Sequence, residues 1–344
     1  MKIIATILLS AIMMFALFSP SNSLSTALGK KSTALDALTI LNKSNHLAPY
    51  VTPDGVAVVT GGNSGIGAVS VATLALAGMK VVLCARNVQS AQDTKQSLPE
   101  YCRPLVDIQE LDLADLNSVE KASKAILAKY GQIDLLLNNA GVMAMPQQQL
   151  TAQGVEMQFG TNHVGHHFLT RLLVPYMKPN GRVVTVASTA HTFATGPTID
   201  WEPAKYSPWG AYGRSKLANI LFAKRLQDLL VESGRADLTS VSLHPGVIGT
   251  SLWKFMPWFF QPFKRFITDK TIEQGAATNV FCSLTDKVTP GAYYSDCQVT
   301  EPTPTAQDVT LRKQLWEYTE ALIANKGFVM PESLVAEKPL VCEQ

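Results

Sequence analysis

Cysteine and charged residues are both scarce in this sequence of 344 residues. Its five cysteines are widely scattered, and an odd number without paired spacing predicts neither a disulfide framework nor a zinc site. Charged residues make up 16% of the chain, and the 29 basic and 27 acidic side chains are mixed along it to a net charge of +2. This balance carries no electrostatic footprint for nucleic acid, so no such partner is expected.

Hydrophobic residues, in contrast, make up 47% of the chain. A chain of this length and composition can bury one large core, which fits a single domain with extensions. From Val56 onward, apolar strand-like runs alternate with helical patterns. That alternation predicts an α/β fold, a single Rossmann-type doubly wound parallel sheet with helices on both faces.

The first 23 residues have the anatomy of a secretory signal peptide. Lys2 precedes an apolar run over residues 3–18, and small residues suited to cleavage follow at 19–23. An apolar run of this length is short for a membrane span, which needs about 20 residues, so a retained signal anchor is the alternative. We therefore expect entry into the secretory pathway, to the lumen or membrane of the endoplasmic reticulum.

Residues 24–50 are interpreted either as a transit-like segment or as a plain linker. Between residues 24 and 45 the chain carries Ser, Thr and Lys with a single acid, Asp36, which resembles a transit peptide behind a signal peptide. Such a tandem would direct the chain to a plastid reached through the secretory pathway. In either case we expect residues 1–50 to lie outside a catalytic domain of residues 51–330, with residues 331–344 as a C-terminal tail.

A glycine-rich turn follows the first strand-like run of the domain. The run covers residues 56–59, and glycines stand at 61, 65 and 67, where a helical pattern begins. In dinucleotide-binding folds such glycines permit the turn, the approach to a pyrophosphate and the packing of the helix on the strand. The free N–H groups and the positive end of the helix would face the phosphates. The turn therefore predicts a dinucleotide site.

The end of the second predicted strand, residues 80–85, favours NADP(H) over NAD(H). The acidic residue that would bind the ribose of NAD is missing there. Ala85 stands in its place and is followed by Arg86, which suits a ribose 2′-phosphate. An exposed Arg at a strand end is the structural alternative, and NAD(H) is the alternative cofactor.

Two further predicted strands end in residues that suit a cofactor. The strand over residues 106–112 ends at Asp112, whose carboxylate can bind the adenine amine or cap a helix that starts near Leu116. The strand over residues 133–137 is followed by Asn138-Asn139-Ala140-Gly141. Small and amide side chains at that edge leave room for a cofactor and can hold neighbouring backbone.

A long helix is predicted to begin near Phe159 and to end before Pro179. Asn162 lies inside it, where Asn is unfavourable by roughly a few tenths of a kcal/mol relative to Ala, so a reason for its presence is expected. The histidines at 163, 166 and 167 lack a partnering acidic motif. We therefore predict no metal site there.

Ser188, Tyr212 and Lys216 form the candidate catalytic set. Ser188 follows a predicted strand over residues 182–187, and a predicted helix runs from 211 to about 230. Because Tyr212 and Lys216 are four residues apart, they share a helix face and can point into one cleft. A Tyr and a Lys four residues apart occur by chance in most proteins. Their combination with Ser188 at the end of the preceding strand is poorly explained by chance.

The last predicted strand of the core, residues 238–243, leads into a run that suits the nicotinamide end of a cofactor. Pro245, Gly246, Val247 and Thr250 lie in this run, and an ordinary strand exit is the alternative. Residues 253–266, farther on, are the most aromatic part of the chain. They are interpreted as a lid over an apolar substrate, as a patch for peripheral membrane contact, or as core.

Together these motifs resemble the short-chain dehydrogenase/reductase superfamily over about residues 55–325, and they look most like its retinol dehydrogenase-like members. Members often carry a basic residue within the glycine turn, where Asn63 and Ser64 stand here, so the NADP preference depends on Arg86. The likeness to that branch rests on Asn139-Ala140-Gly141-Val142-Met143, Asn162-His163-Val164-Gly165-His166, the long gap between Ser188 and Tyr212, His244-Pro245-Gly246-Val247 and Gly291-Ala292-Tyr293-Tyr294-Ser295-Asp296-Cys297.

The resemblance implies a catalytic tetrad of Asn162, Ser188, Tyr212 and Lys216. Tyr212 would act as general acid or base, with a pKa lowered by the Lys216 cation and oxidised nicotinamide. Ser188 would hydrogen-bond the reacting oxygen, and Asn162 would hold a water that relays protons through Lys216, which also binds the nicotinamide ribose. The expected cofactor-binding residues are Gly61, Asn63, Ser64, Gly65, Ile66, Gly67, Arg86, Asp112, Asn139, Ala140, Gly141, Tyr212, Lys216, Pro245, Gly246, Val247 and Thr250.

The expected function is an NADP-dependent oxidoreductase that interconverts a hydrophobic alcohol and its aldehyde or ketone by hydride transfer. A retinoid, a steroid or a lipid-like molecule is the expected substrate. The alternative is a catalytically idle NADP-binding regulatory module that docks on a membrane partner. Because helix pairing into dimers is usual among relatives, the resemblance also implies a homodimer.

Overall fold

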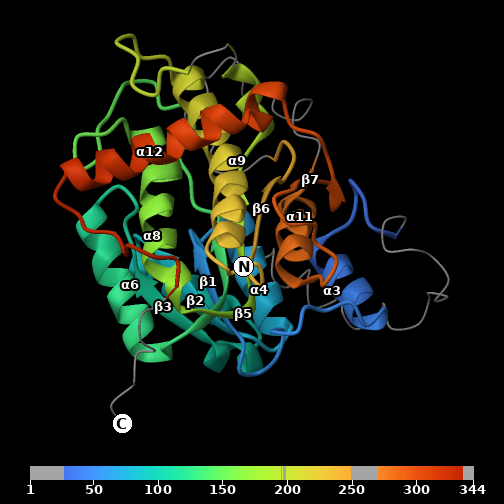
Figure 1. The fold of residues 1–344 in the computed structure, drawn as a ribbon. Coiled ribbons are helices and arrows are strands. Elements are labelled where there is room, and N and C mark those ends of the chain that lie inside the picture. Colours follow the sequence, from blue (N-terminus) through green and yellow to red (C-terminus); the bar gives the residue numbers. More distant parts are fainter. Residues whose placement is uncertain (1–26, 195, 197–198, 249–269, 336–344) are drawn as a thin grey trace.

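The computed structural model describes residues 27–194, 196, 199–248 and 270–335 (Figure 1). Its centre is a sheet made of β1 (Val56–Thr60), β2 (Lys80–Ala85), β3 (Val106–Glu110), β4 (Ile133–Asn138), β5 (Met177–Val186), β6 (Thr239–His244), β7 (Tyr293–Ser295) and β8 (Gln298–Val299). The strand order is β3-β2-β1-β4-β5-β6-β7-β8, and each neighbouring pair is parallel except β7 with β8. The order reverses between β1 and β4, the switch point of a doubly wound sheet, so the predicted fold class is confirmed.

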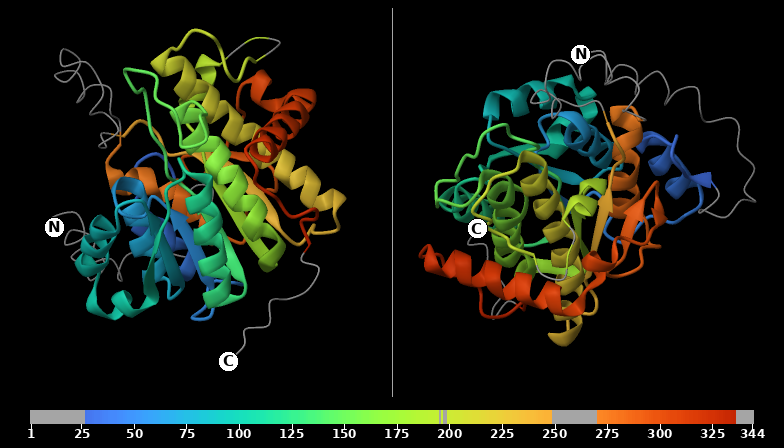
Figure 2. Two further views of the ribbon diagram at one scale, coloured as in Figure 1. Left: turned by 90° about the vertical axis from the view of Figure 1, so that its left-hand side faces the viewer. Right: turned by 90° about the horizontal axis from the view of Figure 1, so that it is seen from above.

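Helices cover both faces of this sheet. They are α3 (Ala34–Lys43), α4 (Gly65–Leu76), α5 (Val88–Ser97), α6 (Leu116–Tyr130), α8 (Gly165–Leu173), α9 (Pro208–Glu232), α11 (Ile272–Leu284) and α12 (Val309–Asn325). Because side chains alternate along a strand, β1 contributes to two cores. Val56 and Val58 pack with α6, α8 and α9, whereas Ala57 and Val59 pack with α3, α4 and α11. Figure 2 shows helices on both faces of the sheet.

The folded domain begins before residue 51, contrary to the expectation from sequence. Thr33 caps α3 in a reciprocal capping box with Asp36, and Ala37 and Leu41 of this helix are fully buried. Helix α3 packs on α11, and the Tyr50 hydroxyl donates a hydrogen bond of 2.5 Å to the Ser283 carbonyl. Residues 27–50 therefore belong to the folded domain, because α3 buries its short apolar face against α11, a helix more than 200 residues away in the chain.

The folded domain also extends beyond residue 330, its expected C-terminal boundary. The Arg171 guanidinium donates to the Pro331 carbonyl at 2.6 Å, and Leu334 is buried in the core cluster of α8 and α9. The beginning of the expected tail at residue 331 thus belongs to the domain. The signal-peptide segment 1–23, Thr250 and the aromatic stretch 253–266 lie outside the described residues.

Helix α12 lies on the outside of α8 and α9 (Figures 1 and 2). The Trp316 ring stacks on Phe222 of α9 with centroids 5.7 Å apart. Two of the three histidines noted in the sequence contact α12, since His163 is 3.0 Å from the Thr319 hydroxyl and His167 is 2.8 Å from the Glu320 carboxylate. These histidines thus join two helices.

Within the part of the chain that the structure describes, no helix combines the length and apolar character needed to cross a bilayer. In the same part, His, Cys, Asp and Glu side chains form no group of three that could hold a metal ion.

Candidate active site

The glycine turn between β1 and α4 has the geometry that a bound pyrophosphate requires. Gly61 and Gly65 have φ angles of +64° and +53°, in the left-handed region that favours glycine. At Gly67 a Cβ atom would lie only 2.2 Å from the Gly61 carbonyl oxygen, so the helix and the turn approach too closely for a side chain. Ser64 makes no side-chain cap, which leaves the first-turn N–H groups of α4 free to bind an anion.

Helix α5 holds this turn in place. The Asn63 amide donates to the Ser90 hydroxyl at 3.1 Å, and the Thr94 hydroxyl donates to the Asn63 carbonyl at 3.0 Å. Sequence reasoning missed Ser90 and Thr94, which carry no motif. Arg86 is exposed at the carboxyl end of β2, where a ribose would lie.

Asp112 does not cap the following helix, so that alternative is wrong. Its carboxylate accepts from the Ala114 N–H at 2.9 Å, whereas the side chain of Asp115 caps α6 by accepting from Asn117. Asp112 therefore orders the loop after β3, and its side chain is only partly buried.

The loop after β4 is fastened to β1 through a residue that the sequence analysis did not single out. The buried Thr60 hydroxyl accepts from the N–H groups of Asn139 and Ala140, at 2.9 and 3.0 Å. The Asn139 amide donates back to the Thr60 carbonyl at 2.8 Å. These contacts present Gly141 to the cavity, and a Cβ there would lie 3.5 Å from the Lys216 ammonium nitrogen.

Asn162 lies in a π-helical turn, η3 (Gly160–Val164), between the short helix α7 (Met157–Phe159) and α8. Its Oδ1 accepts from the Val142 N–H at 2.8 Å, and its Nδ2 donates to the Val142 carbonyl and the Ser215 hydroxyl, both at 2.9 Å. A π turn inside a helix is typical of functional sites and explains why Asn is tolerated here. Sequence reasoning missed Ser215.

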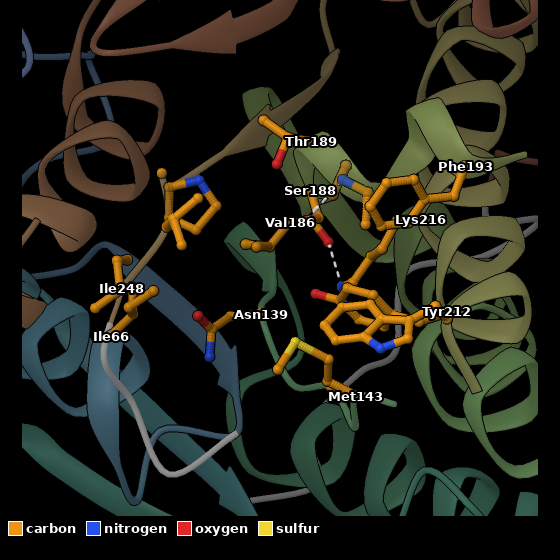
Figure 3. Close-up of a pocket in the computed structure, with 17 residues that line it drawn as sticks. Ile66, Asn139, Met143, Val186, Ser188, Thr189, Phe193, Tyr212, Lys216 and Ile248 are labelled. Carbon is orange, nitrogen blue, oxygen red and sulfur yellow. Dashed lines mark hydrogen bonds between the residues drawn. The ribbon is translucent and has the colours of Figure 1, made fainter. Parts of the chain in front are cut away.

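Ser188, Tyr212 and Lys216 come from two elements and meet at one cavity (Figure 3). Ser188 follows β5, and its carbonyl accepts a hydrogen bond of 2.7 Å from His191, a further residue that the sequence analysis missed. Lys216 on α9 donates to the Val186 carbonyl at 3.0 Å, and its nitrogen lies 5.7 Å from the centre of the Tyr212 ring. Tyr212 and Lys216 are 7% and 3% exposed, so both side chains are largely shielded from solvent.

Burial dominates the proton affinities of this pair. It raises the pKa of Tyr212 to about 12, although a hydrogen bond with Ser188 acts in the opposite direction. Burial also lowers the pKa of Lys216 to about 8. In the protein alone, loss of hydration thus outweighs the neighbouring groups, and the lowering of the Tyr212 pKa expected with oxidised nicotinamide stays a prediction.

The cavity beside these residues has a volume of about 300 Å³. Five residues that were expected to bind the cofactor line it, namely Ile66, Asn139, Pro245, Gly246 and Val247. Figure 3 shows Ile66 and Asn139 across the cavity from Tyr212. Gly141, Tyr212 and Lys216 line it as well. Among the other described residues of that set, Gly61, Asn63, Ser64, Gly65 and Gly67 lie in the glycine turn, and Arg86, Asp112 and Ala140 follow strand ends. The cavity thus extends from Ile66 in the first turn of α4 to Tyr212. A helix N-terminus beside a cavity at the switch point of the sheet is the arrangement that dinucleotide-binding folds use.

The mouth of the cavity is apolar. Met143, Phe193 and Trp209 line it, and the Phe193 and Trp209 rings meet edge to face with centroids 6.1 Å apart. Phe193 is 59% exposed and Trp209 is 38% exposed. None of the three could be assigned from a motif, since apolar residues here look like core residues in sequence.

Comparison with known proteins identifies the family. The chain matches the family model for short chain dehydrogenase over residues 55–257. It is 37% identical over 311 residues to short-chain dehydrogenase TIC 32 B, chloroplastic, from Brassica napus, covering 86% of this chain and 94% of the relative. It is also 37% identical over 274 residues to retinol dehydrogenase 11 from Homo sapiens, covering 77% and 84%.

A solved structure shares the fold. It is an uncharacterized protein from Mycobacterium paratuberculosis, 30% identical, and the match covers 80% of this chain and 95% of that chain with a TM-score of 0.64. The site geometry, the family model and the relatives agree with one another. The chain therefore belongs to the short-chain dehydrogenase/reductase family, in its retinol dehydrogenase-like branch, and is an oxidoreductase that acts on CH–OH donors.

Proposed function

We propose that this enzyme uses NADP(H) to interconvert a hydrophobic alcohol and its aldehyde or ketone. The convergence of Ser188, Tyr212 and Lys216 on a cavity with an apolar mouth is the observation that carries the proposal. A retinoid, a steroid or a lipid-like molecule is the proposed substrate. The identity of 37% to a protein named retinol dehydrogenase 11 supports this class.

Tyr212 is proposed as the general acid in carbonyl reduction and the general base in alcohol oxidation. With a pKa raised to about 12, its phenol is protonated at neutral pH and can donate to a substrate oxygen. Ser188 would donate a hydrogen bond to the same oxygen as charge develops there. A bound nicotinamide supplies or accepts the hydride.

Lys216 and Asn162 are proposed to support Tyr212. The Lys216 cation lies beside the phenol ring and would stabilise the phenolate that forms when Tyr212 gives up its proton. It would also bind the nicotinamide ribose. The Asn162 side chain hydrogen-bonds Val142 and Ser215, and Ser215 precedes Lys216 on α9. We place the relay water between Asn162 and Lys216.

The preference for NADP(H) is proposed from the carboxyl end of β2. Arg86 is exposed there, and the acid that would bind an unphosphorylated ribose is missing. The glycine turn contains no basic residue, since Asn63 and Ser64 are neutral, so Arg86 would act without a basic partner in the turn. NAD(H) is the alternative cofactor.

We further propose that residues 1–23 direct the chain into the secretory pathway, with a plastid as the alternative destination. The relative named as chloroplastic supports that alternative. Because α3 packs on α11, processing must leave residues 27–50 on the mature enzyme. N-terminal sequencing of the mature protein should find a start at about residue 24. A start near residue 51 would contradict this.

Two partner surfaces remain proposals. Residues 253–266 are proposed to contact a membrane surface, and a liposome flotation assay should show weaker binding for a double Trp258→Ala, Phe259→Ala variant. Unchanged flotation would assign this stretch to a lid or to the core. Because α12 covers α8 and α9, the proposed homodimer would pair other surfaces.

A substrate screen tests the proposed reaction. The full-length protein is incubated with NADPH and NADH in parallel and with lipophilic aldehydes of increasing length, and cofactor oxidation is followed. We expect oxidation of NADPH that depends on the aldehyde and on Tyr212. Its absence with every aldehyde would leave the idle NADP-binding module as the better account.

A further inference from the structure

His166 lies at the centre of a buried network that joins the two halves of the active site. It is 1% exposed and belongs to α8, one turn after Asn162. Its Nδ1 lies 2.9 Å from the Asn162 carbonyl oxygen, and its Nε2 lies 2.8 Å from the Thr60 hydroxyl. The ring therefore contacts the element that carries Asn162 and the strand that ends in the glycine turn.

The partners of His166 determine its tautomer. A carbonyl oxygen only accepts hydrogen bonds, so Nδ1 must carry the proton that is donated to Asn162. Nε2 is then the acceptor, and the Thr60 hydroxyl donates to it. That orientation leaves the Thr60 oxygen free to accept from the N–H groups of Asn139 and Ala140, at 2.9 and 3.0 Å.

The environment keeps this ring neutral. Burial lowers the pKa of His166 to about 4, and the nearby Lys216 cation acts in the same direction. In a protonated His166 ring both Nδ1 and Nε2 carry a proton. The Thr60 oxygen would then face three N–H groups, those of His166 Nε2, Asn139 and Ala140. The network is thus consistent only with the neutral Nδ1–H form at neutral pH.

We propose that His166 is a positioning residue with two separable effects. Through Nδ1 it holds the π turn of Asn162, and so the surroundings of Lys216. Through Nε2 and Thr60 it holds the Asn139–Gly141 loop against which the cofactor binds. This inference rests on the proposed function, because the first effect concerns the proton transfers assigned to Tyr212 and Lys216.

Two substitutions separate the effects. The amide of Asn reaches the position of His Nδ1, and the longer Gln reaches the position of Nε2. His166→Asn should retain the contact with Asn162 and lose the one with Thr60, which should weaken NADPH binding about tenfold and leave kcat within about twofold. His166→Gln should do the reverse, lowering kcat about tenfold with NADPH binding nearly unchanged.

His167→Gln is the matched control, because His167 is equally buried but contacts Glu320 on α12. It should change neither quantity by more than about twofold. A purely structural role for His166 would give both of its variants the same kinetic change, or none, and would overturn the proposal. An equal effect of His167→Gln would overturn it as well.

A measurement without substrate keeps the two proposals apart. Nitrogen-15 NMR of the wild-type imidazoles at pH 7 should show His166 as the neutral Nδ1–H tautomer. The Nε2–H tautomer or an imidazolium would overturn the role of His166 whether or not a substrate is found. If none of the aldehydes supports NADPH oxidation by the wild type, the proposed function fails. The NMR tautomer and the NADPH-binding titrations then still test whether His166 positions the cofactor loop through Thr60.

Discussion

The cofactor side and the substrate side of the cavity are built in different ways. On the cofactor side, hydrogen bonds of 2.8 to 3.0 Å tie Thr60 to Asn139 and Ala140, and Gly67 leaves no space for a side chain. On the substrate side, Phe193 and Trp209 offer partly exposed aromatic surface. The cofactor side is thus preorganised for one ligand. The apolar side can bind a range of lipophilic ligands, because the binding energy there depends on the apolar area that is buried.

Removing the Tyr212 hydroxyl should have the largest effect, since it acts where the two sides meet. Tyr212→Phe is expected to lower kcat by about a thousandfold, the usual worth of a general acid, with little change in NADPH binding. Tyr206→Phe is the control, because the Tyr206 hydroxyl donates to the Met145 carbonyl and lies outside the cavity lining. Equal losses in the two variants would mean that Tyr212 has no chemical role.

Acid should weaken the scaffold beneath both sides. Between pH 6.5 and 4 the unfolded chain protonates His166 and the folded chain does not, so stability falls as the pH falls, by about 3 kcal/mol in all. Burial lowers the pKa values of His163 and His167 as well, which adds to the loss. Urea unfolding at pH 7 and 5 should show a smaller pH dependence in His166→Gln. Equal dependence in both proteins would contradict this assignment.

A methyl group at Gly67 should damage the cofactor side selectively. The added Cβ would meet the Gly61 carbonyl, which is backbone and cannot move aside, so Gly67→Ala should destabilise the fold by about 2 kcal/mol and weaken NADPH binding. Gly29→Ala, where no atom lies within 4 Å of the added Cβ, is the control for stability. Wild-type NADPH affinity in Gly67→Ala would mean that the turn does not approach the cofactor.

Arg86 should affect only the choice between the two cofactors. Arg86→Ala removes a cation from the proposed 2′-phosphate site, and the KM for NADPH should rise about tenfold while that for NADH stays unchanged. Steady-state kinetics with both cofactors in one preparation check this. A parallel rise for NADH would assign Arg86 to general stability.

The smallest effect is expected on the substrate side. Trp209→Ala removes part of an apolar rim and should raise the KM for long aldehydes about fivefold, with little change for short ones. NADPH binding is the internal control, because Trp209 lies away from the glycine turn. Equal effects on the KM values of short and long aldehydes would mean that Trp209 does not contact the apolar chain of the substrate.

The same contrast explains how much could be predicted from the sequence. The glycine turn, Ser188, Tyr212 and Lys216 were predictable, because backbone geometry and proton chemistry restrict those positions to very few residue types. Thr60 and His166 were not, since their roles arise from a contact between residues 106 positions apart. His166 belongs to a run that resembles the family, but nothing local in the sequence reveals that it contacts Thr60.

Helix α3 was missed for a related reason. Its Ser, Thr and Lys neighbours favoured a transit-like or linker segment, and its burial depends on α11, which no local pattern reveals. The upward shift of the Tyr212 pKa was missed as well, because desolvation depends on everything that surrounds the ring. The composition of a segment can be read from its own sequence, whereas its burial depends on residues elsewhere in the chain that pack against it.

The most direct test of the account is a crystal structure of the enzyme with NADP⁺ and a lipophilic alcohol that it oxidises. The account predicts that the alcohol oxygen lies within about 3.2 Å of both the Tyr212 and the Ser188 hydroxyl oxygens, with its carbon facing the nicotinamide. An alcohol bound elsewhere, or a Tyr212 hydroxyl turned away from it, would contradict the account.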